Sequence, residues 1–230
     1  MSDEAYSISW FQAQAICQTG AAGSVMHGIS SEEAIYNAIM NYWDWISPQP
    51  NARRHLYHYR NGHGADYLEN VRSLFDANPR IRARIFEKIG DQLRINPRAD
   101  SGSIIGHGAD DGVDPPIRQQ DYDSEDWLNS NGNIDEVYWR LIGDYNPFDN
   151  RETDDRAYYL RALRQGTVFL IPVEIRIRDP YTWHPYESRP SKCIHQAMER
   201  LKSSGAADYT TIGIAQFLLP SVYLPDWIRR

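Results

Sequence analysis

One polar stretch, RIRDPYTWHPYESRP (residues 176–190), holds the side chains best suited to chemistry in this 230-residue chain. It follows an apolar run that predicts a buried strand. It gathers two carboxylates, a phenol, an imidazole and a guanidinium, on Asp179, Tyr181, His184, Glu187 and Arg189. Phosphoester cleavage requires such groups for metal or proton binding, for orientation and for neutralising phosphate charge. Arg189 is the expected anion clamp, because a guanidinium contacts phosphate oxygens in a bidentate manner.

A purely structural interpretation of the same stretch stays open, and composition alone favours it. In that interpretation Asp179 pairs with Arg178 or Arg189 and holds the loop in place. Tyr181 and Trp183 would then pack on the sheet, and His184 would face solvent.

The neighbouring segments predict how this loop is positioned. Strict alternation of apolar and charged residues in PVEIRIRD (172–179) indicates a strand with one buried and one solvated face. SKCIHQAMERLKSSG (191–205) predicts a helix that ends at Gly205, and YTTIGIAQFLL (209–219) predicts a final strand. A strand, polar loop, helix and strand in this order place the loop at the rim of a sheet, open to solvent.

The first half of the chain has helical periodicity, and the second half does not. Apolar residues recur at helical spacing in three segments before residue 94: 8–17, 30–47 and 51–93. Residues 96–125 are rich in Gly, Asp, Ser and Pro and predict a long loop. Three segments then favour strands, with a hairpin at Gly166: 133–145, 157–163 and 167–177.

These patterns predict an α+β fold. We expect a helical subdomain (1–98), a loop-rich connection (99–128) and a β-rich subdomain that carries the site (129–230), all in one compact unit. The sheet is expected to be antiparallel and partly barrel-like, with one C-terminal helix.

Charge and hydropathy exclude several classes of function. A net charge of -7 and a pI near 5.5 lack the basic field that nucleic-acid binding requires, so we expect no nucleic-acid partner. No apolar run approaches the roughly 20 residues that cross a bilayer, and the first residues do not resemble a signal peptide. An exported chain would therefore leave the cell by another route.

The two cysteines predict no disulfide framework. Cys17 and Cys193 lie far apart in unlike contexts, which favours two buried thiols and leaves one bridge open. A cysteine-dependent cell-wall amidase that uses Cys17 is a further hypothesis. Cys17 lies inside its predicted helix, however, and not at the helix N-terminus, where the helix dipole would lower the pKa of its thiol.

Histidines and loop carboxylates are expected to be ordinary surface groups. His55 and His58 share a helix face, but no acidic residue completes a HExxH-like pattern, so with His63 they are expected at the surface beside a glycine turn. A second group lacks the closing Glu of an EF-hand loop and is expected to be solvated: Asp110, Asp111 and Asp114.

The chemistry-bearing stretch carries a pattern found in a known family. It runs Asp179-Pro180-Tyr181-Thr182-Trp183, has Arg189 ten positions after Asp179, and precedes a helix and a last strand. Residues 133–219 thereby resemble the activity domain of the colicin M family of bacteriocins. The resemblance implies an antibacterial toxin that acts in the periplasm of a target bacterium. It would cleave lipid II between the lipid and its pyrophosphate, with a divalent cation, here Mg²⁺ bound through Asp179.

Two positions depart from the family pattern. Thr182 stands where the family has a second Asp, and Ser188 stands where it often has His. Either His184 or Glu187 has then taken over a role, or the chain has lost the reaction and serves as a binding or interaction protein. The resemblance also implies partners: lipid II or a related undecaprenyl-pyrophosphate lipid, an immunity protein, and a membrane contacted only peripherally. Without an import domain, delivery by a contractile or contact-dependent secretion machine is expected.

Overall fold

The computed structural model describes residues 14–20, 22, 28–96, 99–107, 112–142, 170–183 and 192–223. Its α-helices are α2 (Ser31–Asn41), α3 (Pro50–Asn61), α4 (Val71–Ala77), α5 (Pro79–Ile95), α6 (Glu125–Asn131) and α8 (Lys192–Leu201). A π-helix, η1 (Tyr42–Ile46), and three 3-10 turns, η2 (Gln119–Asp121), η3 (Lys202–Ser204) and η4 (Ser221–Tyr223), complete the helical elements. The strands are β1 (Tyr67–Glu69), β2 (Ser101–Ile105), β3 (Glu136–Leu141), β4 (Leu170–Tyr181) and β5 (Tyr209–Pro220).

Local sequence explains where the helices begin. The hydroxyl of Ser30 accepts a hydrogen bond from the backbone N–H of Glu33 at 3.2 Å and caps α2. Pro50 and Pro79 occupy the first turns of α3 and α5, where a missing N–H costs nothing. The predicted helical layer of the first half is therefore confirmed over its described residues.

The five strands form one mixed sheet in the order β1-β5-β4-β3-β2. β2, β3, β4 and β5 pair antiparallel, and β1 pairs parallel with β5. The predicted α+β class is confirmed. Two details of the prediction are wrong: the sheet is open, not barrel-like, and one of its pairings is parallel. β1 comes from the helical half of the chain, where only helices were predicted.

One strand lies in a segment that was predicted to be a loop. Ser101–Ile105 forms β2 and pairs along its length with β3. Its sequence, SGSII, has low strand propensity and too few apolar residues to show alternation. Pairing with β3 therefore decides its conformation. The predicted strand at 157–163 and the hairpin at Gly166 lie outside the described residues.

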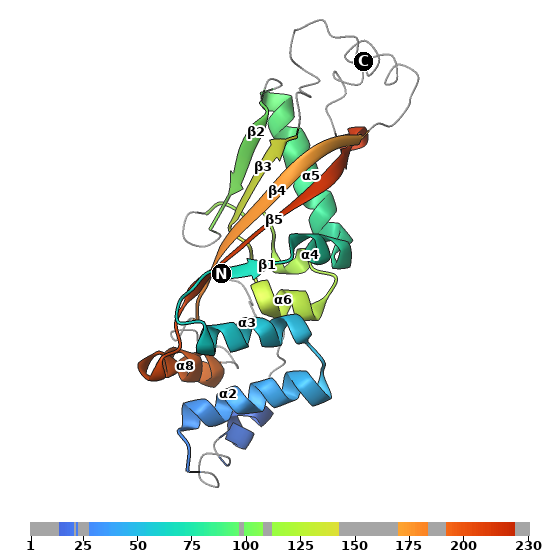
Figure 1. Cartoon of the computed structure of the whole chain (residues 1–230). Helices are drawn as coiled ribbons and strands as arrows, with labels where there is room; N and C mark the ends of the chain where they lie inside the picture. The colour runs from blue at the N-terminus through green and yellow to red at the C-terminus, as the bar shows by residue number, and fades with distance from the viewer. Residues whose placement is uncertain are drawn as a thin grey trace, which may run out of the picture.

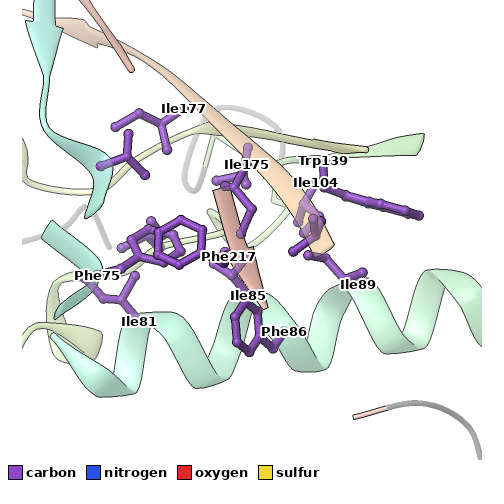
Figure 2. Packing of buried hydrophobic residues seen from close by; sticks show 14 of the residues in the cluster. Phe75, Ile81, Ile85, Phe86, Ile89, Ile104, Trp139, Ile175, Ile177 and Phe217 are labelled. Atoms are coloured by element: carbon purple, nitrogen blue, oxygen red, sulfur yellow. The ribbon is translucent and has the colours of Figure 1, made fainter. Parts of the chain in front are cut away.

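A first core fills the space between one face of the sheet and helices α4 and α5. Odd-numbered residues of β4, including Ile175 and Ile177, point toward this side, and Figure 2 shows them beside the α5 side chains. Phe75 of α4 stacks on Phe217 of β5, with ring centroids 4.9 Å apart. The alternation predicted for β4 is confirmed for its apolar residues, whereas Glu174, predicted on the wet face, is buried beneath Arg140 and Arg176.

A second core lies beyond the end of β4, where α2, α3 and α8 gather (Figure 1). Trp43, Leu56, Tyr59 and Met198 are buried there. β4 and β5 contribute to both cores, so the long strands link the helical and β-rich parts.

A disulfide joins the two cysteines, so the expectation of two separate thiols is wrong. Cys17, in the helical residues 14–20, bonds to Cys193 of α8, and their Cα atoms lie 6.5 Å apart. The cysteines are 176 positions apart in the chain and become neighbours only through the second core.

Among the described helices, none is long and apolar enough to cross a membrane.

Candidate functional site

Asp179 lies on the strand and not, as predicted, on a solvent-open loop. β4 continues through Tyr181, and the alternation that buries Ile175 and Ile177 also turns Asp179 inward. The Asp179 side chain is buried, with 4% of the residue exposed. Its Oδ1 accepts a hydrogen bond from the backbone N–H of Asp135 at 3.1 Å.

Burial makes the Asp179 carboxyl a weak acid. Desolvation is the main cause that raises its pKa well above the ordinary value of 3.8, and the charges of Asp135 and Glu136 raise it further. The hydrogen bond from the Asp135 backbone opposes this shift without cancelling it. The folded protein therefore holds the proton of this carboxyl more tightly than the unfolded chain does.

The expected ion pair between Asp179 and Arg178 does not form. Adjacent residues of a strand point to opposite faces, and Arg178 lies on the solvated face. There its Nη1 binds the Glu136 carboxylate at 3.2 and 3.3 Å. Three other residues of the predicted site lie outside the described residues, as does Ser188: His184, Glu187 and Arg189.

Tyr181 ends β4 inside the second core. Its ring stacks on Tyr209 with centroids 4.7 Å apart and an interplanar angle of 12°, and it meets Trp183 edge-on at 6.1 Å. Both Tyr181 and Trp183 are buried. The predicted packing of these two aromatic residues is confirmed, and it keeps the Tyr181 ring in one orientation at the end of the strand.

Two buried hydroxyls accompany Asp179. Thr211 is its direct partner in the β4–β5 ladder, and Tyr122 is close enough for the Asp179 charge to raise its pKa. Burial is the larger cause of that shift, which takes the Tyr122 pKa well above 10.0. Neither the Thr211 nor the Tyr122 hydroxyl has a hydrogen-bond partner among the described residues. Buried hydroxyls rarely stay unsatisfied, so the Thr211 and Tyr122 hydroxyls mark a polar region around the buried carboxyl.

A hydrogen-bonded chain of three side chains supports this site from α3. His55 Nε2 lies 2.8 Å from Glu69 Oε2, and His55 Nδ1 lies 2.9 Å from the hydroxyl of Tyr209. Glu69 also accepts from the backbone N–H of Asn70 at 2.7 Å. Since Tyr209 stacks on Tyr181, the chain anchors the aromatic floor next to Asp179.

The expectation of a surface His55 is therefore wrong. His55 is fully buried, whereas His58 is half-buried and His63 is exposed. A signal for this was present in the sequence, because His55 lies on the same helical stripe as the buried Ala52 and Leu56.

The chemistry available at Asp179 is proton donation. A buried acid with a raised pKa is a candidate proton donor to a leaving oxygen. Mg²⁺ prefers ionised carboxylates, and the raised pKa of Asp179 works against that role. Among the described residues, no group of three or more His, Cys, Asp or Glu is arranged to hold a metal ion. The Mg²⁺ expectation remains a prediction.

Two other expectations can be placed. Asp114 is 71% exposed and pairs with Arg118, as expected for a solvated loop charge, while Asp110 and Asp111 lie outside the described residues. Cys17 is bonded to Cys193 and so offers no thiolate for a cysteine hydrolase.

Comparison with known proteins returns no similarity: no family model, no curated protein and no solved structure matches this chain.

Proposed function

We propose that this protein hydrolyses a lipid-linked pyrophosphate, and that its substrate is lipid II in the periplasm of a target bacterium. The observation that carries the proposal is the Asp179 carboxyl, buried at the end of β4 opposite Thr211, with its pKa raised by burial. Asp179 and Tyr181 are also the first two residues of the pattern that resembles the colicin M family.

In the proposed reaction, Asp179 is the general acid. Water attacks the phosphorus next to the lipid, a new P–O bond forms, and the P–O bond to the undecaprenyl oxygen breaks. The leaving alkoxide takes the proton of Asp179 and departs as undecaprenol. His184 or Glu187 would accept the proton of the attacking water, and Arg189 would neutralise the pyrophosphate.

The positions of the other residues agree with these roles. Asp179 lies two residues before the end of β4 and is 4% exposed, so the proposed reaction requires the rim of the sheet to open toward the substrate. The stacked rings of Tyr181 and Tyr209 would form an apolar wall next to the reacting bond. A low-dielectric wall keeps the acid protonated until the leaving oxygen requires the proton.

The test is release of undecaprenol from purified lipid II, with and without Mg²⁺. We expect wild-type protein to release it and Asp179→Asn to be at least about a hundredfold slower, the usual contribution of a general acid. Asp91→Asn is the matched control, because the Asp91 side chain is 59% exposed on α5, pairs with Arg94 and should not affect activity when replaced. If wild-type protein releases no undecaprenol while a colicin M family member does, the proposed function is wrong.

A binding protein that keeps the fold without the chemistry is the second candidate, favoured by Thr182 in place of a carboxylate. It is distinguished by expression with a periplasmic signal. An enzyme should kill only with the signal, and Asp179→Asn or Arg189→Ala should abolish killing. Killing that survives both substitutions would favour the binding protein.

A further inference from the structure

The face of the sheet opposite α5 carries a set of charged side chains that the proposed function does not use. No described helix covers this outer face, which Figure 1 shows in front of α5. Arg140 of β3 and Arg176 and Arg178 of β4 lie on it, with side chains 58%, 55% and 55% exposed. Three neighbouring guanidinium groups are unusual on a chain with a net charge of -7.

The acidic partners of these arginines lie beneath them. The Glu174 side chain is 6% exposed and binds two arginines: Arg140 through Nε at 2.7 Å and Nη2 at 3.0 Å, and Arg176 through Nε and Nη2, each at 3.0 Å. Hydrogen bonding from Arg140 is the main cause that lowers the Glu174 pKa. One carboxylate therefore holds two cations in place, and their Nη1 groups have no acceptor among the described residues.

The third arginine is held in a similar way. Arg178 binds Glu136, whose side chain is 16% exposed and which also accepts from the Tyr138 hydroxyl at 2.9 Å. The acids are thus covered while the guanidinium groups face outward. Three arginines over two glutamates leave the outer face with an excess of positive charge. Arginines fixed in this way lose little entropy when they bind a phosphate.

An apolar stripe runs beside the arginines. In the sheet register, Arg178 lies opposite Ile212, which lies opposite Leu68, and Arg176 lies opposite Ile214. Leu68 is 78% exposed and Ile214 is 53% exposed. The arginines, the stripe and Ser101 and Ser103 of β2 line one shallow hollow of about 860 Å³. That volume lies in the range of small-molecule sites.

We propose that this outer-face hollow binds the pyrophosphate ester of a lipid alcohol. The guanidinium groups match the anionic end, and the stripe of Leu68, Ile212 and Ile214 matches the start of the apolar chain. Free pyrophosphate would leave the apolar stripe in water, and an uncharged lipid would make no use of the excess positive charge. The site is distinct from Asp179, which faces the other side of the sheet, so the bound lipid is held here and not cleaved.

The experiment is calorimetric titration of the whole, disulfide-bonded chain with farnesyl pyrophosphate, inorganic pyrophosphate and farnesol. We expect farnesyl pyrophosphate to bind at least tenfold more tightly than pyrophosphate, and farnesol not to bind measurably. Arg176→Gln and Arg178→Gln should each weaken the binding of farnesyl pyrophosphate about tenfold or more. Leu68→Ser should weaken that of farnesyl pyrophosphate and leave that of pyrophosphate unchanged.

Arg94→Gln is the matched control, because Arg94 is 61% exposed on α5 and pairs with Asp91, away from the outer face. It should bind like wild type. Equal affinity for farnesyl pyrophosphate and pyrophosphate would overturn the lipid part of the proposal. Affinities that Arg176→Gln and Arg178→Gln leave unchanged would overturn the site, and so would a lack of binding by the wild type.

The inference does not depend on the proposed function, and the two can fail separately. Asp179→Asn should bind farnesyl pyrophosphate as wild type does, because its side chain is on the other face. Lipid binding without undecaprenol release would refute the hydrolase and leave the outer-face site. If the wild type shows no lipid binding at this hollow while Arg176→Gln releases undecaprenol at the wild-type rate, the outer-face site is refuted and the hydrolase is retained.

Discussion

Replacing Asp179 by Asn should remove a pH dependence from the stability of this protein. The pKa of the buried carboxyl is raised above 3.8, so the folded state keeps a proton that the unfolded chain loses. The resulting stabilisation is complete below the unfolded pKa and is lost as pH rises through the folded pKa. Asn at position 179 keeps an oxygen that can accept from the Asp135 N–H and has no proton to lose.

The size of the effect follows from linkage. Between the two pKa values the folded state binds one more proton than the unfolded chain, so the free energy of unfolding falls by about 1.4 kcal/mol for each pH unit. Above the folded pKa the contribution is constant, and the slope returns to that of the rest of the protein. The wild-type curve should therefore fall more steeply than that of Asp179→Asn above pH 3.8.

Urea unfolding at several pH values from about 4 to about 8, with the disulfide intact, measures this difference. Subtracting the Asp179→Asn curve from the wild-type curve cancels the other titrating groups. Asp66→Asn removes an exposed carboxyl and should reproduce the wild-type slope. Parallel curves for wild type and Asp179→Asn would show that Asp179 is ionised in the folded protein, and the general acid would be refuted with it.

Three other changes test the packing around the site. Reduction of the Cys17–Cys193 disulfide should lower the free energy of unfolding by about 2–5 kcal/mol, because the disulfide closes a long loop. A variant with Ala at both positions should not respond to reductant in the same urea assay. Glu69→Ala should lower the free energy of unfolding in urea by about 1–3 kcal/mol, since it leaves Nε2 of the buried His55 without its hydrogen-bond partner. Unchanged stability would contradict the hydrogen-bonded chain. Gly213→Ala should cost about 1–3 kcal/mol, because its Cβ would lie 2.7 Å from the backbone oxygen of Glu69, and a wild-type urea midpoint would show that β1 moves easily.

Local patterns predicted the elements whose repeat is long enough to be seen. β4 alternates over twelve residues, and α8 buries Ile194, Ala197, Met198 and Leu201 at helical spacing. The same alternation could have placed Asp179 on the inner face, two positions after Ile177. Its polarity suggested a loop instead, because a carboxyl is seldom buried without an ionic partner.

Short and mixed segments could not be predicted in this way. β2 has five residues and β1 has three, which is too short for a period, and each is a strand because a neighbour supplies its hydrogen bonds. His55 was missed because an imidazole on an apolar stripe is stable only with a buried partner. That partner, Glu69, is fourteen positions away and on another element.

The sequence by itself determined the helical first half, the two faces of β4 and the residue types available for phosphate chemistry, because each depends on neighbours within a few positions. The tertiary structure decided which groups meet. It set Thr211 opposite Asp179, joined Cys17 to Cys193, and laid Arg140 beside Arg176 on the outer face. The burial that raises the Asp179 pKa depends on chain segments that are distant in sequence and exclude water together. No local pattern carries that information.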